Sequence, residues 1–448
     1  MKETKKMDLK QLEDVMKDPG GGGGGGGGGG VVEKKETLNS DHIQNKPPLD
    51  SATALQAFLD HIPISSIPGI KNSPELQVLE LDAGKSVRDA IELLYEKNVC
   101  GAPIADVPDP DATIGRFSDR YIGFIDLASI ILWSLEKCET AHIQTKDSGG
   151  GGGGEPGKSG FFTMLEQNPQ IGQTKIGELA KSFLWESFFP VRLDDTLFHI
   201  LLLLSKHRLN VVPVIERPDS QIMGFVTQNA VFQLLLQSNG LDWFDGIADK
   251  ALSEFRFENE DHVVQVCGDQ SVAEAMQILC KNRVGIIAVV DRGTKRLIGG
   301  MRRSDIYLLL ENDNIYHKRE TLSMEEFVHT DTSKTDSDPA IERDIGALLS
   351  AGVLRLRNSF LPRMDQPVTN KKTDPLKQAM KNLAETKSFF SFLVDDLQQV
   401  TGVLTIRDII IQFAPPCIDS SIHGGGFFES ALEQAGCKIE NGTMICDH

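Results

Sequence analysis

The chain has 448 residues, of which 40% are hydrophobic and 25% charged, a globular composition in a chain too long for one ordinary domain. Its 64 acidic and 46 basic residues give a formal net charge of −18, which argues against a nucleic-acid-binding surface, because such a surface needs a basic footprint. No apolar window approaches the length of a membrane span and no secretory signal is evident, so we expect a cytoplasmic or nuclear protein whose seven cysteines are reduced.

Polar stretches divide the chain into folded segments. Residues 1–50 contain an unbroken glycine run from Gly20 to Gly30. Because polyglycine loses the most backbone entropy on ordering, we expect a disordered tail there. Residues 139–176 are expected to form a Gly-rich linker, residues 316–345 an acidic linker, and residues 416–448 a C-terminal tail.

One strand–turn–helix junction recurs four times between these stretches. Each copy follows a short apolar run and opens a helix rich in Ile and Leu. Units of this size cannot bury their own faces, so neighbouring copies must pair. The junctions span residues 123–129, 224–230, 299–305 and 402–408. They define repeats at residues 51–138, 177–240, 241–315 and 346–415, and their uneven spacing predicts two tandem pairs, the first repeat with the second and the third with the fourth.

Every repeat has the same predicted order: an amphipathic helix, an apolar strand, a second strand that ends at the junction, and a final helix. The first helices are expected at 87–94, 197–204, 272–279 and 376–383, each preceded by an N-cap-type residue: Ser86, Thr196, Ser271 and Asp374. The first strands are expected at 102–105, 211–215, 286–290 and 391–394. The final helices should contain residues 130–133, 231–235, 306–310 and 409–411.

This fourfold pattern resembles the CBS (cystathionine-β-synthase-type) motif, and four tandem copies resemble the gamma subunits of AMP-activated and plant sucrose-non-fermenting-related kinases. Two local matches, Asn98 to Ile104 and His207-Arg208-Leu209 followed by Pro213-Val214, are similar to the first and second repeats of those subunits. The insertion Pro108 to Arg120 is more typical of a divergent plant gamma-like subgroup. The resemblance implies an α+β fold of four CBS repeats that form two tandem CBS-pair (Bateman-type) modules.

The resemblance also implies a regulatory protein rather than an enzyme. It would be a gamma-like subunit of a serine/threonine kinase complex, with alpha- and beta-type partners and AMP, ADP or ATP bound in clefts between repeats. In that family the Thr or Ser and the Asp of a junction hold the ribose, and basic residues hold the phosphates. The chemistry agrees, since a carboxylate can accept both ribose hydroxyls and a helix N-terminus with a nearby arginine suits a phosphate.

Repeat 4 has the complete junction, with Thr405 and Asp408, and is the predicted ribose-binding position. An equally weighted alternative is that Thr405 caps the helix and Asp408 complements its dipole. Repeat 3 has Asp305, with Arg302 and Arg303 as candidate phosphate ligands; the alternative for the two arginines is a solvated surface position, which we favour.

Repeats 1 and 2 depart from the pattern. Repeat 2 has Thr227 but Ala230 in place of the acid, although His207 and Arg208 match the phosphate-contacting dipeptide of the family. The alternative for that dipeptide is a helix C-terminus, which favours basic residues. Repeat 1 has Asp126 and Ser129 in exchanged order. The basic dipeptide is matched by Phe389-Phe390 in repeat 4, and Cys100 takes the place of an arginine in repeat 1.

Two other functions compete with the kinase-subunit hypothesis. One is a kinase-independent CBS ligand sensor, or a scaffold with vestigial nucleotide sites. The other is an NTPase, because Gly152 to Ser159, with Lys158, matches a P-loop pattern. A P-loop follows a buried strand, and the preceding residues 140–147 are polar, so a chance match within polyglycine is the favoured interpretation. We expect no metal site and no covalent cofactor.

Overall fold

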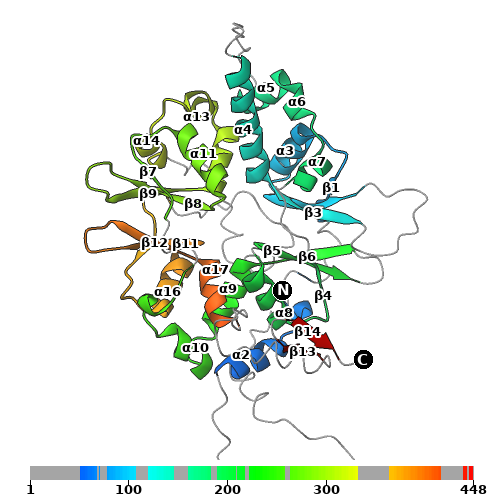
Figure 1. The fold of residues 1–448 in the computed structure, drawn as a ribbon, viewed down its shortest axis with the longest axis vertical. Coiled ribbons are helices and arrows are strands. Elements are labelled where there is room, and N and C mark those ends of the chain that lie inside the picture. The colour runs from blue at the N-terminus through cyan, green and yellow to red at the C-terminus, as the bar shows by residue number, and fades with distance from the viewer. Residues whose placement is uncertain are drawn as a thin grey trace, which may run out of the picture. The chain divides into compact units, whose positions relative to one another are not determined.

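The computed structural model describes residues 51–67, 70, 78–106, 120–145, 160–182, 189–207, 209–216, 221–257, 263–330, 363–414, 437–440 and 443–446. The predicted tail, residues 1–50, lies outside these ranges, as do parts of the predicted linkers. Among the described segments, four copies of one unit account for most helices and strands (Figure 1).

Each repeat contains three short strands, a first helix and a junction helix. Repeat 1 has β1 (Leu81–Asp82), α3 (Val87–Glu96), β2 (Gly101–Ala105), β3 (Tyr121–Asp126) and α4 (Leu127–Thr145). Repeat 2 has β4 (Val191–Arg192), α8 (Leu197–Lys206), β5 (Val211–Glu216), β6 (Gln221–Thr227) and α9 (Gln228–Gln237). Repeat 3 has β7 (Gln265–Cys267), α11 (Val272–Asn282), β8 (Ile286–Val290), β9 (Leu297–Arg302), the 3₁₀ helix η4 (Arg303–Tyr307) and α12 (Leu308–Glu311). Repeat 4 has β10 (Thr369–Asn370), α16 (Leu376–Thr386), β11 (Phe390–Val394), β12 (Val400–Thr405) and α17 (Ile406–Phe413).

The four sheets share one topology. In each sheet the first strand pairs in parallel with the second, and the second pairs antiparallel with the third. The antiparallel ladder is interrupted at the same place in every repeat, between Ile104 and Ala105, Val214 and Ile215, Val289 and Val290, and Leu393 and Val394. A bulge shifts the register locally and increases the twist, so its recurrence shows that the four sheets are copies of one unit.

Two of the four predicted N-caps of the first helices are confirmed by side-chain hydrogen bonds. Ser86 and Ser271 accept hydrogen bonds from the backbone N–H groups of the third helical residues, Asp89 and Glu274. Thr196 occupies the N-cap position but its side chain makes no capping bond. In repeat 4 the prediction was one residue early: Pro375 is the N-cap, and the Asp374 carboxylate instead accepts from the backbone N–H of Lys371.

In the structure each repeat begins at its first strand, later in the chain than the bounds expected from the sequence. Each repeat is completed by a segment that precedes the first strand of its pair partner. The first N–H of the first helix donates to a carbonyl in that segment, and the bond has nearly the same length in all four repeats. The bonds join Val87 to Thr174 (2.9 Å), Leu197 to Ile62 (2.9 Å), Val272 to Leu322 (3.0 Å) and Leu376 to Lys250 (2.9 Å). Repeats 1 and 2 therefore exchange their leading segments, and so do repeats 3 and 4.

The exchanged segments carry short helices that bury apolar side chains against the neighbouring repeat. They are α2 (Ser51–Asp60) with η1 (Ile64–Ser66), α7 (Ile176–Ser182), α10 (Asp242–Ala248) with η3 (Leu252–Glu254), and α14 (Met324–Val328). For example, Phe244 of α10 is fully buried and stacks on Phe413 of α17, with ring centroids 5.3 Å apart. Because such burial is the main source of folding free energy, no single repeat has a complete core.

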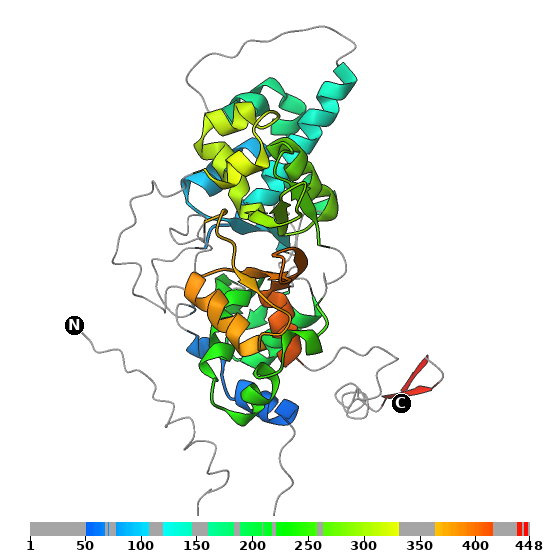
Figure 2. The same cartoon turned by 90° about the vertical axis from the view of Figure 1, so that its left-hand side faces the viewer.

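Sheet faces also pack within each predicted pair. Phe124 and Phe225, from repeats 1 and 2, meet edge-to-face in a small cluster with Tyr121 and Ile222. Residues of repeats 3 and 4 form an equivalent cluster that includes Ile286 and Phe392, and Figures 1 and 2 show the strands of these repeats facing one another. The predicted pairing of repeat 1 with 2 and of repeat 3 with 4 is therefore confirmed.

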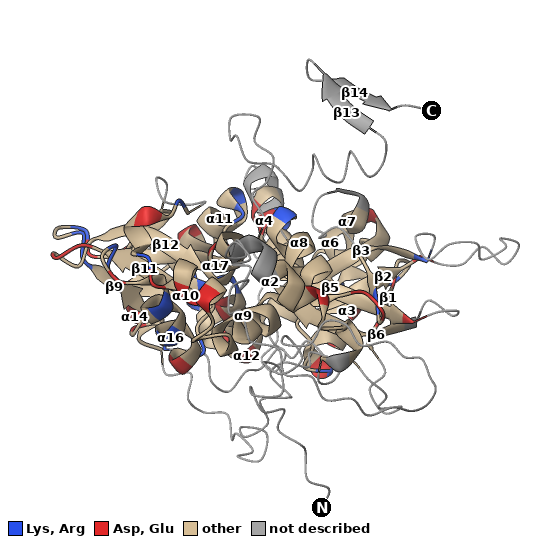
Figure 3. Ribbon diagram, turned by 90° about the horizontal axis from the view of Figure 1, so that it is seen from below, with Lys and Arg blue, Asp and Glu red and all other residues tan. Residues whose placement is uncertain are grey.

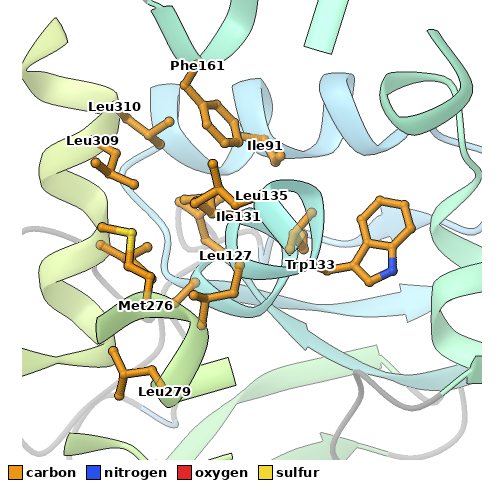
Figure 4. Packing of buried hydrophobic residues seen from close by; sticks show 14 of the residues in the cluster. Ile91, Leu127, Ile131, Trp133, Leu135, Phe161, Met276, Leu279, Leu309 and Leu310 are labelled. Carbon is orange, nitrogen blue, oxygen red and sulfur yellow. The ribbon is translucent and has the colours of Figure 1, made fainter. Parts of the chain in front are cut away.

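The helices pack each repeat against a repeat of the other module. One apolar cluster contains residues of repeats 1 and 3, and a second contains residues of repeats 2 and 4. In the first cluster, Leu127 and Ile131 of α4 lie beside Met276 of α11 and Leu309 of α12 (Figure 4). Trp133, also on α4, is 8% exposed and belongs to this packing rather than to a surface.

The predicted linkers are partly structured. Within residues 139–176, helix α4 continues to Thr145, and α5 (Gly160–Gln167) and α6 (Pro169–Gly172) follow. Phe161 of α5 is fully buried and meets Tyr316 of α13 (Asp313–Lys318) edge-to-face. Within 316–345, α14 packs on repeat 3, and the predicted tail 416–448 contains a hairpin of β13 (Cys437–Glu440) and β14 (Thr443–Cys446). These segments were predicted as linkers because their few apolar residues are scattered among polar ones.

Candidate functional site

The junction of repeat 4 forms a reciprocal capping box at the start of α17. The Asp408 Oδ2 accepts hydrogen bonds from the backbone N–H of Thr405 (2.8 Å) and from its hydroxyl (2.6 Å). The Thr405 Oγ1 in turn accepts from the backbone N–H of Asp408 at 3.2 Å. The structure therefore shows the capping role that the sequence left open, with Asp408 only 2% exposed.

The junction of repeat 3 differs because an arginine takes the N-cap position. Arg302 donates from its backbone N–H and its guanidinium to both oxygens of Asp305, at 2.7 to 3.0 Å. The two side chains are 12% and 5% exposed. The next residue, Arg303, reaches repeat 1, where its Nη2 lies 2.7 Å from the Asp126 Oδ2. The favoured expectation of two solvated arginines was wrong, since both are in ion pairs.

The other two junctions are simpler caps. The Asp126 carboxylate of repeat 1 accepts from the backbone N–H of Ser129 at 2.9 Å and from its hydroxyl at 2.6 Å. In repeat 2 the Thr227 hydroxyl accepts from the backbone N–H of Ala230 at 3.2 Å. In repeat 1 the exchanged order of acid and hydroxyl thus gives a working cap, in which a carboxylate accepts the backbone hydrogen bond that a hydroxyl accepts in repeats 2 and 4.

One backbone hydrogen bond fixes the correspondence among the four repeats. The first N–H of each junction helix donates to a carbonyl in the loop before the middle strand. The bonds join Leu127 to Cys100 (2.8 Å), Gln228 to Asn210 (3.2 Å), Arg303 to Gly285 (2.9 Å) and Ile406 to Phe389 (3.0 Å). Phe389 therefore corresponds to Asn210, and Lys387 corresponds to Arg208.

This correspondence corrects one expectation. Phe389 and Phe390 correspond to Asn210 and Val211, and not to the His207-Arg208 dipeptide. Cys100 also corresponds to Asn210, and its replacement of a family arginine stays a prediction. Counting back two residues from each carbonyl gives Asn98, Arg208, Arg283 and Lys387. Asn98, Arg283 and Lys387 share a left-handed backbone with φ of 55°, 52° and 53°, a conformation that is uncommon outside glycine. Lys387 is therefore a basic residue that motif matching missed.

The predicted dipeptide of repeat 2 is described only at its first residue. His207 is the C-cap of α8, and its ring stacks on that of Phe189 with centroids 4.6 Å apart. Arg208 lies outside the described residues. Nearby, Arg407 of α17 donates from Nη2 to the carbonyl of Ser205 at 3.3 Å, so the end of α8 contacts the junction of repeat 4.

The surroundings of the P-loop-like stretch do not fit a P-loop. Residues 146–159 lie outside the described residues, and the element described before them is a helix, α4, whereas a P-loop follows a strand. The first N–H of the helix that follows, at Gly160, donates to the Asp313 Oδ1 at 2.8 Å. A carboxylate thus occupies the helix N-terminus at which a P-loop would hold a phosphate.

The described residues contain neither a cluster of potential metal ligands nor a helix long and apolar enough to cross a bilayer. Acidic and basic residues are interspersed over the described ribbon (Figure 3). The polar groups of the described residues that could bind a ligand are therefore capped helix N-termini, ion-paired side chains and a few basic residues in loops.

Comparison with known proteins identifies the repeat. Residues 180–237 match the CBS domain family. The chain therefore contains a CBS domain. This match covers repeat 2, and the other three CBS repeats follow from their common sheet topology, bulge position and junction hydrogen bond. The expected α+β fold of two CBS-pair modules is thereby confirmed.

Two curated relatives align with most of the chain. It is 25% identical over 405 residues to the SNF1-related protein kinase regulatory subunit gamma-1 of Arabidopsis thaliana, covering 87% of this chain and 89% of the relative. It is 27% identical over 339 residues to the gamma-1-like regulatory subunit of the same plant, covering 63% and 74%. The solved structure of protein MJ1225 from Methanocaldococcus jannaschii aligns with a TM-score of 0.47 and 13% identity, over 79% of this chain and 100% of that one.

Proposed function

We propose that this protein is a non-catalytic, gamma-like regulatory subunit of a serine/threonine kinase complex with alpha- and beta-type partners. The observation that carries the proposal is the extent of the similarity to the Arabidopsis gamma-1 regulatory subunit, 87% of this chain and 89% of the relative. A resemblance limited to one CBS unit would not define the partner. A resemblance over most of both chains is what a shared role in a multi-subunit assembly would produce.

Within this role, we assign adenine-nucleotide binding to repeat 4. Thr405 and Asp408 lie at the N-terminus of α17, and Lys387 lies in the loop that the same helix contacts through the bond between Ile406 and Phe389. A carboxylate and a hydroxyl suit ribose hydroxyl groups, and a lysine suits a phosphate. A ligand that binds one assembly state more tightly would shift the kinase complex toward that state.

Two measurements on the full chain test this proposal. The first is co-purification with kinase alpha and beta subunits. The second is calorimetric titration with AMP, ADP and ATP of the wild type, the Thr405→Ala/Asp408→Ala variant and Lys387→Gln. Lys381→Gln is the matched control, because Lys381 is exposed on α16 and its loss changes the charge equally. We expect both site variants to lose at least tenfold in affinity and the control to retain it.

One observation favours a second candidate, a CBS scaffold with vestigial nucleotide sites or a kinase-independent ligand sensor. Asp126, Asp305 and Asp408 are all engaged by groups of the chain itself. Absence of heat at millimolar nucleotide together with retained kinase subunits would identify a scaffold. Saturable nucleotide binding without any kinase subunit would identify a sensor.

A further inference from the structure

An ion pair joins the junctions of repeats 1 and 3. The Arg303 Nη2 lies 2.7 Å from the Asp126 Oδ2, across 177 residues of sequence, and the two side chains are 33% and 21% exposed. The same carboxylate also accepts the two hydrogen bonds from Ser129. Both oxygens of Asp126 are therefore held by the chain, one by the N–H of Ser129 and the other by its hydroxyl and by Arg303.

A second pair makes this region electrically balanced. Arg302 and Asp305, next to Arg303 on the same turn, form a largely buried bidentate pair. Two guanidinium groups thus face two carboxylates, and their formal charges cancel. An incoming anion would have to displace a carboxylate from a charge-assisted hydrogen bond of 2.7 Å, which is among the stronger polar contacts in proteins.

The elements that carry the two pairs also contribute apolar side chains to one cluster. Leu127 and Ile131 of α4 and Leu309 of α12 belong to the cluster that repeats 1 and 3 share (Figure 4). Burial raises the pKa of Tyr307 well above its ordinary value, and the neighbouring Cys100 and Asp126 raise it further. The Arg303 and Asp126 side chains are 33% and 21% exposed, so removing one partner leaves the other charge only partly solvated and should cost more than the loss of an exposed pair.

At the equivalent positions of repeats 2 and 4, both of which the structure describes, no such pair is present. The junction hydrogen bonds place Thr227 at the position of Asp126 and Ile406 at the position of Arg303. Neither residue is charged. The two halves, repeats 1 with 3 and repeats 2 with 4, therefore use different chemistry at the same place in the fold.

We propose that Asp126 and Arg303 form a latch that fastens repeat 1 to repeat 3 and closes that half to anionic ligands, so that phosphate-containing ligands are confined to the half formed by repeats 2 and 4. The ligand part of this inference rests on the proposed nucleotide-binding function, whereas the latch itself does not. Arg303 is then a structural cation rather than a phosphate contact.

The latch is tested by a double-mutant cycle on the full chain. The variants are Asp126→Asn, which keeps an oxygen for the cap of α4, Arg303→Gln, and the two together. Arg292→Gln is the matched control, since Arg292 lies in the same repeat and pairs with Asp269 with both side chains mostly exposed. We expect each latch variant to raise the unfolding equilibrium constant about tenfold, the double variant to be no worse than the more damaging single one, and the control to change little.

The ligand part is tested by calorimetric titration of the same variants with ATP and with inorganic pyrophosphate. We expect Arg303→Gln to bind ATP within about twofold of the wild type, while Thr405→Ala/Asp408→Ala loses at least tenfold. A tenfold loss in Arg303→Gln would overturn the inference, as would additive effects in the cycle. If the wild type binds neither compound, the proposed nucleotide function fails and the cycle alone decides whether the latch exists.

Discussion

The backbone N–H of Leu376 donates a 2.9 Å hydrogen bond to the carbonyl of Lys250. The first helix of repeat 4 thus begins on a segment that precedes repeat 3 in the chain. Bonds of the same kind begin the first helices of the other three repeats, at Val87, Leu197 and Val272, so all four repeats exchange their leading segments. Stability should accordingly be a property of each module rather than of each repeat.

Phe244→Ala tests this dependence. Phe244 lies on α10, before repeat 3, but it is fully buried against Phe413 of repeat 4. Removing the ring should cost about 3–5 kcal/mol. Urea unfolding, followed by fluorescence, should show the loss, whereas Lys250→Ala, an exposed position next to the same helix, should change stability little. A Phe244→Ala effect below about 1 kcal/mol would contradict the exchange.

The capping box of repeat 4 predicts a graded effect at Thr405. Thr405→Ala removes an acceptor for the Asp408 N–H and should cost about 1 kcal/mol, whereas Thr405→Ser keeps the acceptor and should be nearly neutral. Thermal unfolding measures both. Equal destabilisation by Ala and Ser would mean that the methyl packing, and not the cap, matters at this position.

Cys280 should be a slow nucleophile. Burial, followed by the nearby Glu136, raises the pKa of its thiol to about 11, from a reference value of 9.0. At pH 8 the thiolate fraction is then about 100-fold lower than in the unfolded chain, and alkylation should slow by a similar factor because the thiolate is the reactive form. Peptide-resolved iodoacetamide labelling measures this rate. Glu136→Gln should speed the reaction, and a rate unchanged from that of the urea-unfolded protein would contradict the prediction.

The pair of Lys377 and Asp245 should stabilise the protein only above the acid range. The Lys377 Nζ lies 2.9 Å from the Asp245 Oδ1, and this hydrogen bond lowers the pKa of that carboxyl. A carboxyl with a lowered folded-state pKa contributes stability above its unfolded value, near 3.9, and loses that contribution as the pH falls through the folded value. Urea midpoints of Lys377→Met and wild type should therefore differ modestly at pH 7 and converge in acid, as the pH falls through the lowered pKa of Asp245. A difference that persists in acid would point to packing of the lysine stem instead.

Local patterns in the sequence predicted the repeats well. Apolar spacing located the first helices and the strands, and glycines located the junctions, because these features depend on neighbours only a few residues away. The exchange of leading segments could not be predicted this way, since Val87 and Thr174 are joined only by a backbone hydrogen bond that carries no side-chain signal.

The candidate site was predicted less completely. Thr405 and Asp408 were predicted from the resemblance of their junction to the CBS motif. Nothing in the sequence indicated that Arg303 pairs with Asp126, 177 residues away. Lys387 was missed because its neighbours, Ser388 and Phe389, do not resemble those of Arg208. Its left-handed backbone and the bond from Ile406 to Phe389 reveal the match only in three dimensions.

The exchanged segments also constrain the order of events during synthesis. As the chain leaves the ribosome, α2 and η1 emerge before the other elements of the first module. The carbonyl of Ile62 can accept its hydrogen bond only after Leu197 has been synthesised. Repeat 1, in turn, cannot close until Thr174 and α7 have appeared. The nascent first module should therefore stay open until nearly all of repeat 2 has been translated, and then close in one step. Its apolar leading helix would meanwhile be a ready target for chaperones.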